Sequence, residues 1–147
     1  MADYETYEVR VYKNGDKEWY QNGKLHRTDG PAIEYADGGK SWYVNNKLNR
    51  TDGPAVEYAD GYKAWCQNGE YHRTDGPAVE YANGHKEWLQ NGKFHRTNGP
   101  AVEYADGRKA WYIDGVKYTE EEFKKKMNSC DGKTVTVDGK EYRLTAI

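Results

Sequence analysis

Three histidine–arginine pairs recur along the chain, each close in sequence to a tryptophan. The pairs are His26-Arg27, His72-Arg73 and His95-Arg96, and Asn49-Arg50 takes the same place in a further copy. A guanidinium beside an indole ring can stack on planar bases, and it can bind phosphates or carboxylates. The structural alternative is that each Arg pairs with the Asp two residues later or lies on a neighbouring Trp. Recurrence in every copy favours this alternative.

The other repeated side chains are not expected to perform catalysis or to bind metal. Equivalent histidines in successive copies should lie on the order of 10–14 Å apart, whereas zinc ligands lie about 2.0–2.1 Å from one ion. Acid–base catalysis needs two carboxylates with different pKa values, and each copy offers its Glu the same surroundings. The sequence therefore predicts no catalytic residue, no metal site and no cofactor. The glutamates concerned are Glu34, Glu57, Glu80 and Glu103.

Three further residues that can carry chemistry are expected to have structural roles. Cys66 stands where other copies have Tyr or Leu, so it is predicted to be a small core residue. Cys130 is far from Cys66 and outside any motif, so neither a disulfide nor a zinc site is indicated. His85 occupies a variable position after a turn, where we expect it to be solvated.

The composition favours one domain that is rich in aromatic rings. The chain has 147 residues, of which 36% are hydrophobic, with 14 Tyr and 5 Trp. The net charge of −2 provides no basic field for nucleic acid, which is therefore not expected as a partner. Because no apolar run has the length of a membrane span, we expect no membrane association and a cytoplasmic location.

A strict 23-residue repeat positions these side chains. All five tryptophans recur at this interval, and tyrosines and arginines keep it as well. Each copy carries Asp-Gly or Asn-Gly at two places, except that Asn45-Asn46 replaces Asn-Gly once, and such pairs indicate two-residue hairpin turns of type I′. The sequence therefore predicts an all-β, antiparallel meander or solenoid of about five hairpin repeats. The repeated rings and guanidinium groups include Trp42, Trp65, Trp88, Tyr35, Tyr58, Tyr81, Arg50, Arg73 and Arg96, beside His72 and His95.

The turns also predict which side chains share a face of the sheet. A two-residue loop at Asp37-Gly38 places Tyr35 opposite Lys40 and Ile33 opposite Trp42. One face is then expected to carry Val or Ile, Tyr, Lys, Trp and His. The other face carries Ala, Glu and an apolar pair such as Cys66 with Tyr71. Rings on both faces of one layer mean that the sheet curls, dimerises or binds a partner.

Both ends of the chain depart from the repeat. Residues 1–11 are predicted to form a capping strand before the array, which covers residues 12–118. Thr119 and Glu122 have the spacing of a capping box, so we expect a helix over 119–127. Asp138-Gly139 then indicates a hairpin over 133–147. The helix and the hairpin together form the predicted C-terminal cap at residues 119–147, at the end of the sheet.

The order Gly-Pro-Ala, Glu-Tyr, Asp-Gly, Lys, Trp and Asn-Gly resembles the variant MORN-type repeats over about residues 8–118. The His-Arg-Thr-Asp-Gly-Pro segment departs from the common MORN consensus and is similar to a version often seen in phage and large DNA virus proteins. The resemblance implies an elongated β-meander that contacts proteins or lipids and serves in scaffolding. It implies no enzymatic activity and no single ligand.

The leading functional hypothesis is therefore a non-catalytic module that binds a host or viral protein through Trp, Tyr and Arg. If a phage encodes it, inhibition of a host defence protein in the host cytoplasm is a reasonable form of this function. One alternative is a protein that binds a small ligand or nucleotide through the repeated Arg and Trp. Another alternative is a structural scaffold that assembles into a homo-oligomer.

Overall fold

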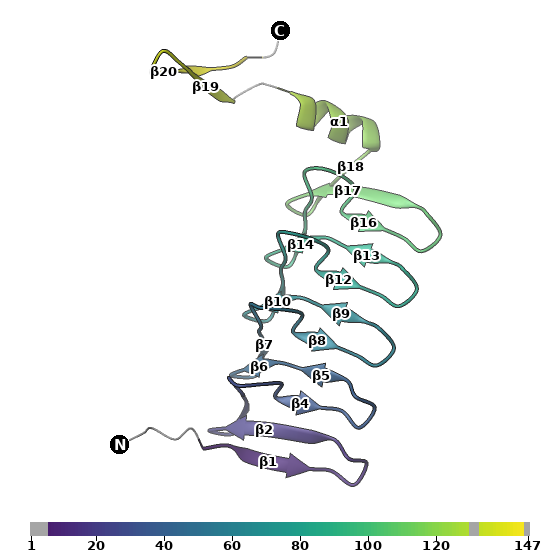
Figure 1. The fold of residues 1–147 in the computed structure, drawn as a ribbon. Helices are drawn as coiled ribbons and strands as arrows, with labels where there is room; N and C mark the ends of the chain where they lie inside the picture. Colours follow the sequence, from purple (N-terminus) through teal and green to yellow (C-terminus); the bar gives the residue numbers. More distant parts are fainter. Residues whose placement is uncertain (1–5, 130–132, 146–147) are drawn as a thin grey trace.

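The computed structural model describes residues 6–129 and 133–145, and it is an all-β array of stacked hairpins followed by one helix and a hairpin. Successive hairpins lie side by side along one axis, with the N-terminal hairpin at one end and helix α1 at the other (Figure 1). The predicted antiparallel meander is confirmed. Within the described residues, no helix has the length and apolar character needed to cross a lipid bilayer.

A twelve-stranded antiparallel sheet runs through the whole array. Its strands follow one another in sequence order, so each hairpin pairs with the next one and no connection crosses the sheet. The strands are β1 (Glu8–Val11), β2 (Lys17–Gln21), β3 (Lys24–Leu25), β4 (Ile33–Glu34), β5 (Lys40–Ser41), β8 (Val56–Glu57), β9 (Lys63–Ala64), β12 (Val79–Glu80), β13 (Lys86–Glu87), β16 (Val102–Glu103), β17 (Lys109–Ile113) and β18 (Val116–Tyr118).

Short hairpins beside this sheet hold the second turn of the three middle repeats. In these turns both central residues have positive φ, as at Asn68 (53°) and Gly69 (88°), which is the type I′ geometry that the sequence predicts. Asn45-Asn46 keeps this geometry without Gly, with φ values of 51° and 65°. The strands are β6 (Tyr43–Val44), β7 (Lys47–Leu48), β10 (Cys66–Gln67), β11 (Glu70–Tyr71), β14 (Leu89–Gln90) and β15 (Lys93–Phe94).

The first turn of each repeat is one residue longer than predicted. The Tyr35 N–H donates to the Gly39 carbonyl, so Ala36, Asp37 and Gly38 form a three-residue loop. Only Gly38 has positive φ (95°), and the Asp37 carboxylate accepts the Gly39 N–H at 2.9 Å. Asp-Gly fits this turn with a bulge as well as it fits a two-residue turn. The sequence alone therefore did not fix the loop length.

The extra loop residue changes the register, and the predicted division of the two faces is wrong. Ile33 lies opposite Ser41 and Glu34 lies opposite Lys40, whereas Trp42 was expected opposite Ile33. A shift of one residue moves a side chain to the other face. Val or Ile and Tyr therefore share a face with the apolar pairs, while Lys and Trp share the opposite face with Glu.

The buried core lies on the face that carries Val and the apolar pairs. Val56, Ala64 and Cys66 form one cluster with Ala55, and Leu48 packs against it. The thiol residue Cys66 is only 1% exposed, so its predicted role as a small core residue is confirmed. The next repeat builds an equivalent cluster from Ala78, Val79 and Leu89.

Backbone hydrogen bonds join each side hairpin to the next repeat. The Arg50 N–H donates to the Cys66 carbonyl at 3.0 Å, and the Gly69 N–H donates to the Leu48 carbonyl at 2.9 Å. The same two bonds recur in the other repeats. Each unit is therefore held by its neighbours, as in other quasi-one-dimensional arrays.

The C-terminal elements have the expected types. Helix α1 (Glu120–Asn128) has Thr119 as its N-cap, and the capping box between Thr119 and Glu122 is complete. The helix packs against β17 and β18, and Phe123 is its buried residue. Strands β19 (Thr134–Val137) and β20 (Lys140–Arg143) form the last hairpin, which is exposed throughout and extends away from the array (Figure 1). Residues 1–5 of the predicted capping strand, Cys130, and residues 146–147 lie outside the described residues.

Candidate functional site

Each repeated Arg is held by four groups on the tryptophan face of the sheet. The Arg73 guanidinium lies over the Trp65 ring, 3.9 Å from its centroid. Its Nε donates to Asp75 at 2.7 Å, and its Nη1 donates to the Pro77 carbonyl at 3.2 Å and to Glu80 at 3.4 Å. We call this arrangement the arginine clamp. The Asp and Trp contacts of the structural alternative are therefore present together.

The arginine clamp recurs with little change in the other repeats. Arg27, Arg50 and Arg96 lie 4.3, 3.9 and 3.9 Å from the centroids of Trp19, Trp42 and Trp88. Hydrogen bonding to Arg lowers the pKa of Asp29, Asp52 and Asp75 below its usual value. Asn98 replaces the Asp in the last clamp and accepts from Arg96 at 3.1 Å. The candidate residues Arg50, Arg73, Arg96, Trp42, Trp65 and Trp88 are all parts of clamps.

The candidate histidines connect neighbouring repeats. His72 lies opposite Trp65, and its Nδ1 accepts the Asn91 backbone N–H at 3.2 Å. His95 makes the same contact with Asp114, and the side chain of Asn49 replaces the imidazole with a bond of 2.9 Å to the Asn68 N–H. These side chains therefore fix the turn of the following unit.

Shallow hollows separate successive arginine clamps. One hollow of about 400 Å³ lies between Arg50 and Arg73, and another of about 480 Å³ lies between Arg73 and Arg96. Thr, Asp, Gln and His side chains line both hollows. Polar recesses of this kind are suited to water or a small polar group, but the guanidinium groups beside them already have partners.

The candidate tyrosines lie on the opposite face, where they form a continuous row of rings. Tyr62 and His85, which occupy one repeat position that was not a predicted binding position, also belong to this row. Tyr35 contacts Tyr58 at 5.6 Å between centroids, and Tyr58 stacks on Tyr62 at 5.5 Å. The row continues through Tyr81 and His85, with separations between 4.9 and 5.2 Å. We call this row the tyrosine ladder; its members are Tyr35, Tyr58, Tyr62, Tyr81, His85 and Tyr104.

The predicted solvation of His85 is wrong. Its ring lies between Tyr81 and Tyr104, its side chain is only 15% exposed, and its Nε2 lies 2.8 Å from a Glu87 oxygen. The equivalent position is Tyr62 in the preceding repeat and Arg108 in the following one, where the guanidinium lies over Tyr104. The signal that could have identified this position is that all three residues carry a flat π-system.

Burial changes the acidity of several groups on the ladder face. It raises the pKa of Tyr58 to about 12, with a further contribution from the neighbouring Tyr35. The pKa values of Tyr62 and Tyr81 are raised for the same reason. Burial also raises the pKa of Cys66 to about 11, so this thiol stays protonated at neutral pH and is a poor nucleophile.

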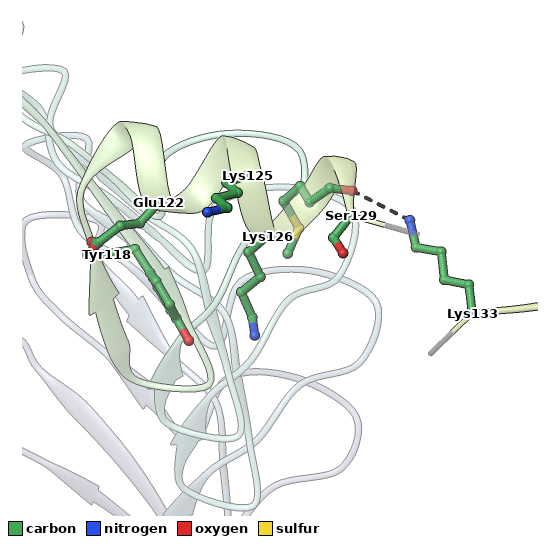
Figure 2. Close-up of a pocket in the computed structure, with 7 residues that line it drawn as sticks. Tyr118, Glu122, Lys125, Lys126, Ser129 and Lys133 are labelled. Atoms are coloured by element: carbon green, nitrogen blue, oxygen red, sulfur yellow. Dashed lines mark hydrogen bonds between the residues drawn. The ribbon is translucent and has the colours of Figure 1, made fainter. Parts of the chain in front are cut away.

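A separate hollow lies beside α1, away from the ladder and the clamps. It has a volume of about 640 Å³ and is lined by Tyr118, Glu122 and the lysines Lys125, Lys126 and Lys133 (Figure 2). The Lys126 ammonium lies 5.6 Å from the centre of the Tyr118 ring, and Lys133 donates to the Met127 carbonyl at 3.5 Å. Its polar lining consists of long, exposed side chains, which do not build a preorganised site.

No group of three His, Cys, Asp or Glu among the described residues could hold a metal ion. No protein-family model matches the chain, and no curated protein matches its sequence significantly. The resemblance to MORN-type repeats therefore stays a prediction that rests on the repeat itself. The candidate residues separate into an arginine–tryptophan face and a tyrosine face, so they do not form one site.

Proposed function

We propose that this protein is a non-catalytic module that binds another protein through the tyrosine ladder. The observation that carries the proposal is a continuous row of rings, three of which remain exposed to solvent. Tyr58, Tyr81 and Tyr104 keep 43%, 40% and 37% of their surfaces accessible. Tyr dominates the energetics of many protein interfaces because it combines a large apolar body with a polar hydroxyl.

The ladder also has the rigidity of a good binding surface. Each ring is held by its neighbours along the row, and the buried residues Val56 and Val79 lie beneath this face. Side chains that are already ordered lose little conformational entropy when a partner binds. An ordered aromatic surface therefore gains more from contact than a set of mobile side chains.

The partner is expected to present basic and apolar side chains. The turns beside the ladder carry Asp37 and Asp60, and Asp60 lines a shared hollow with Tyr58, Tyr62 and Tyr81. Carboxylates next to ring faces attract Arg and Lys through charge and through cation–π contacts. We accordingly propose a partner protein with Arg or Lys in an apolar surface patch.

The arginine clamps are less suited to binding. A phosphate that approached Arg73 would have to replace Glu80 and Asp75, which already accept its hydrogen bonds. This favours the ladder over the alternative of a nucleotide site built from Arg and Trp. The resemblance to phage and viral repeats extends the proposal to a host or viral target, including a host defence protein inhibited in the host cytoplasm.

Partner capture with matched variants tests the proposal. We expect the wild-type protein to retain a stoichiometric partner from a host lysate, and Tyr58→Ser with Tyr81→Ser to lose it. The control is Lys63→Ser with Lys86→Ser, which changes exposed residues on the opposite face and should retain the partner. Retention by the ladder variant, or loss in the control alone, would contradict the proposal.

Ligand titration separates the nucleotide alternative. Four of the five tryptophans, Trp19, Trp42, Trp65 and Trp88, lie in the clamps, so a nucleotide or a glycan that bound there would quench their fluorescence in a saturable way. We expect no saturable change with either class. If a ligand did cause saturable quenching and Arg73→Lys abolished it, the binding site would lie on the arginine–tryptophan face instead of on the ladder.

A further inference from the structure

The two ends of the twelve-stranded sheet differ in exposure. At the C-terminal end α1 packs on β17 and β18 and buries Phe123. At the N-terminal end all four residues of β1 are exposed, with Val9 at 47% and Val11 at 68%. An exposed edge strand presents backbone groups that can pair with another strand. Within residues 6–129 and 133–145, β1 pairs with β2 alone, so this part of the array has an open edge at β1.

The outward backbone groups of this edge belong to the odd-numbered residues. The Tyr12 N–H donates to the Asp16 carbonyl at 2.9 Å, so Tyr12 directs its backbone groups toward β2. Because these directions alternate along a strand, Glu8 and Arg10 also bond to β2. The N–H and C=O groups of Val9 and Val11 consequently point outward from the sheet.

We propose that β1 pairs antiparallel with β1 of a second copy of this chain, with Val9 opposite Val9 on the two-fold axis. In this register each Val9 N–H donates to the Val9 carbonyl of the other copy. The pair on the axis then consists of two outward-directed residues. Glu8 lies directly opposite Arg10 on each side of the axis.

Charge complementarity selects this register from its neighbours. The outward N–H and C=O groups would also remain paired if each strand shifted by one residue along its partner, in either direction. One shift places Glu8 opposite Glu8, and the other places Arg10 opposite Arg10. Like charges directly opposite one another destabilise an antiparallel pair, whereas opposite charges stabilise it. Glu8 and Arg10 already form an ion pair of 2.7 Å along the strand. The dimer extends this pair to a group of four alternating charges.

This pairing joins the sheets of the two copies into one continuous sheet, and the assembly stops at a dimer. The two-fold axis is perpendicular to the sheet, so both tyrosine ladders face the same side. An isologous contact of this kind uses the same edge on both copies and leaves no edge for further growth. The inference is independent of the proposed function, because β1 lies outside the ladder.

Charge-swap variants test the register. Sedimentation equilibrium of the wild-type protein should show a mass that rises toward twice the monomer mass with concentration. Glu8→Lys alone and Arg10→Glu alone should each weaken dimerisation by tenfold or more, while an equal mixture of the two should form heterodimers. Equal dimerisation by wild type and both single variants would overturn the proposal, and so would a wild-type monomer at every concentration.

Site-specific crosslinking provides a second measurement that does not depend on the charge variants. Cα atoms in a hydrogen-bonded antiparallel pair lie about 5.5 Å apart, within the range of about 4.4–6.8 Å that a disulfide spans. In a Cys130→Ser background, Val9→Cys should oxidise to a covalent dimer. Val11→Cys should not, because the two copies of this residue lie away from the axis. Equal crosslinking of both variants, or of neither, would overturn the proposed register.

Discussion

The arginine–tryptophan face and the tyrosine face use aromatic rings in opposite ways. On the first face four of the five tryptophan rings are each covered by a guanidinium, as Trp88 is by Arg96 at 3.9 Å. On the second face the rings contact one another, and Tyr58 and Tyr81 remain 43% and 40% exposed. On the first face, polar groups of the same chain therefore already cover the rings. On the second face, ring surface remains exposed that a partner can cover.

The repeat pattern of the two faces differs in the same sense. The clamp keeps the same residue types in every full copy, apart from Asn98 in place of Asp. The ladder contains one position that changes from Gly39 to Tyr62, His85 and Arg108. A residue that every unit needs for stability must recur, whereas a residue that shapes a surface can vary. By this reasoning the recurring Tyr35, Tyr58, Tyr81 and Tyr104 contribute to stability as well, while the variable position shapes the surface of the ladder.

Removal of an arginine clamp should give the largest effect on stability. Arg73→Ala leaves Glu80 without its cation, uncovers Trp65 and removes the donor to the Pro77 carbonyl. We expect a loss of about 2 kcal/mol in the free energy of unfolding. Arg73→Lys should lose about half as much, because Lys keeps the charge but not the planar fork.

Chemical denaturation of both variants measures this loss. Lys86→Ala is the control, because this exposed residue lies on the same face outside the clamp. It should change stability by less than about 0.5 kcal/mol. An Arg73→Ala variant as stable as this control would remove the distinction between the two faces.

Removal of a ladder ring should cost less stability than removal of a clamp. Tyr81→Ala deletes the contacts with Tyr62 and His85 at 5.2 and 4.9 Å. Aromatic pairs contribute about 0.5–1.5 kcal/mol, and partial exposure lowers this, so we expect a loss of about 1 kcal/mol. Tyr81→Phe keeps the ring and should stay close to wild type. A loss greater than that of Arg73→Ala would mean that the ladder is chiefly structural.

Completion of the ladder should stabilise the protein slightly. Gly39 occupies the position of Tyr62, and an added Cβ would lie 3.1 Å from both Tyr35 Cδ2 and Asp37 Oδ1, so the Tyr35 ring and the Asp37 carboxylate must shift. Gly39→Tyr adds a ring contact and reduces the freedom of the unfolded chain, which together should contribute about 0.5 kcal/mol. A rise of about 2 °C in the melting temperature is expected. A fall in the melting temperature would show that the Tyr35 ring and the Asp37 carboxylate cannot move aside.

Acid should weaken the clamps by the smallest amount. The pKa of Asp75 is lowered by its hydrogen bond with Arg73, so the stability that it contributes is present above the ordinary value of 3.8 and is lost as the pH falls through the lowered pKa. Asp75→Asn should make stability less dependent on pH in this range, as Asn98 already does in the last clamp. The effect is small because these carboxylates are exposed. Denaturation midpoints at about pH 6 and about pH 3 compare the two proteins.

Much of the fold follows from the sequence because local signals specify it. The second turns, the capping box at Thr119 and the last hairpin each depend on residues a few positions apart. The register of the first hairpin failed, because Asp37-Gly38 is compatible with two loop lengths. One additional loop residue decides whether Tyr35 lies on the same face of the sheet as Trp42. Because the loop is one residue longer than predicted, the predicted binding residues lie on two faces instead of one.

The role of His85 was also hidden, for a different reason. Its partners are Tyr81 and Tyr104, which belong to different repeats, and its ring replaces a tyrosine and precedes an arginine at the same position. Residue identity is not kept there, while planarity is. A comparison of residue types alone therefore misses a contact that depends only on the shape of the side chain.

Because the hairpins stack at a regular spacing, the length of the tyrosine ladder increases by a fixed amount with each repeat. Neighbouring strands lie about 4.8 Å apart, so each unit of two strands lengthens the row by roughly 10 Å. Because units meet through the same backbone bonds, a gene that gained or lost one in-frame repeat would change the reach of the surface without altering its local contacts. Under the proposed function, the number of copies would set the length of the partner surface that the ladder can contact.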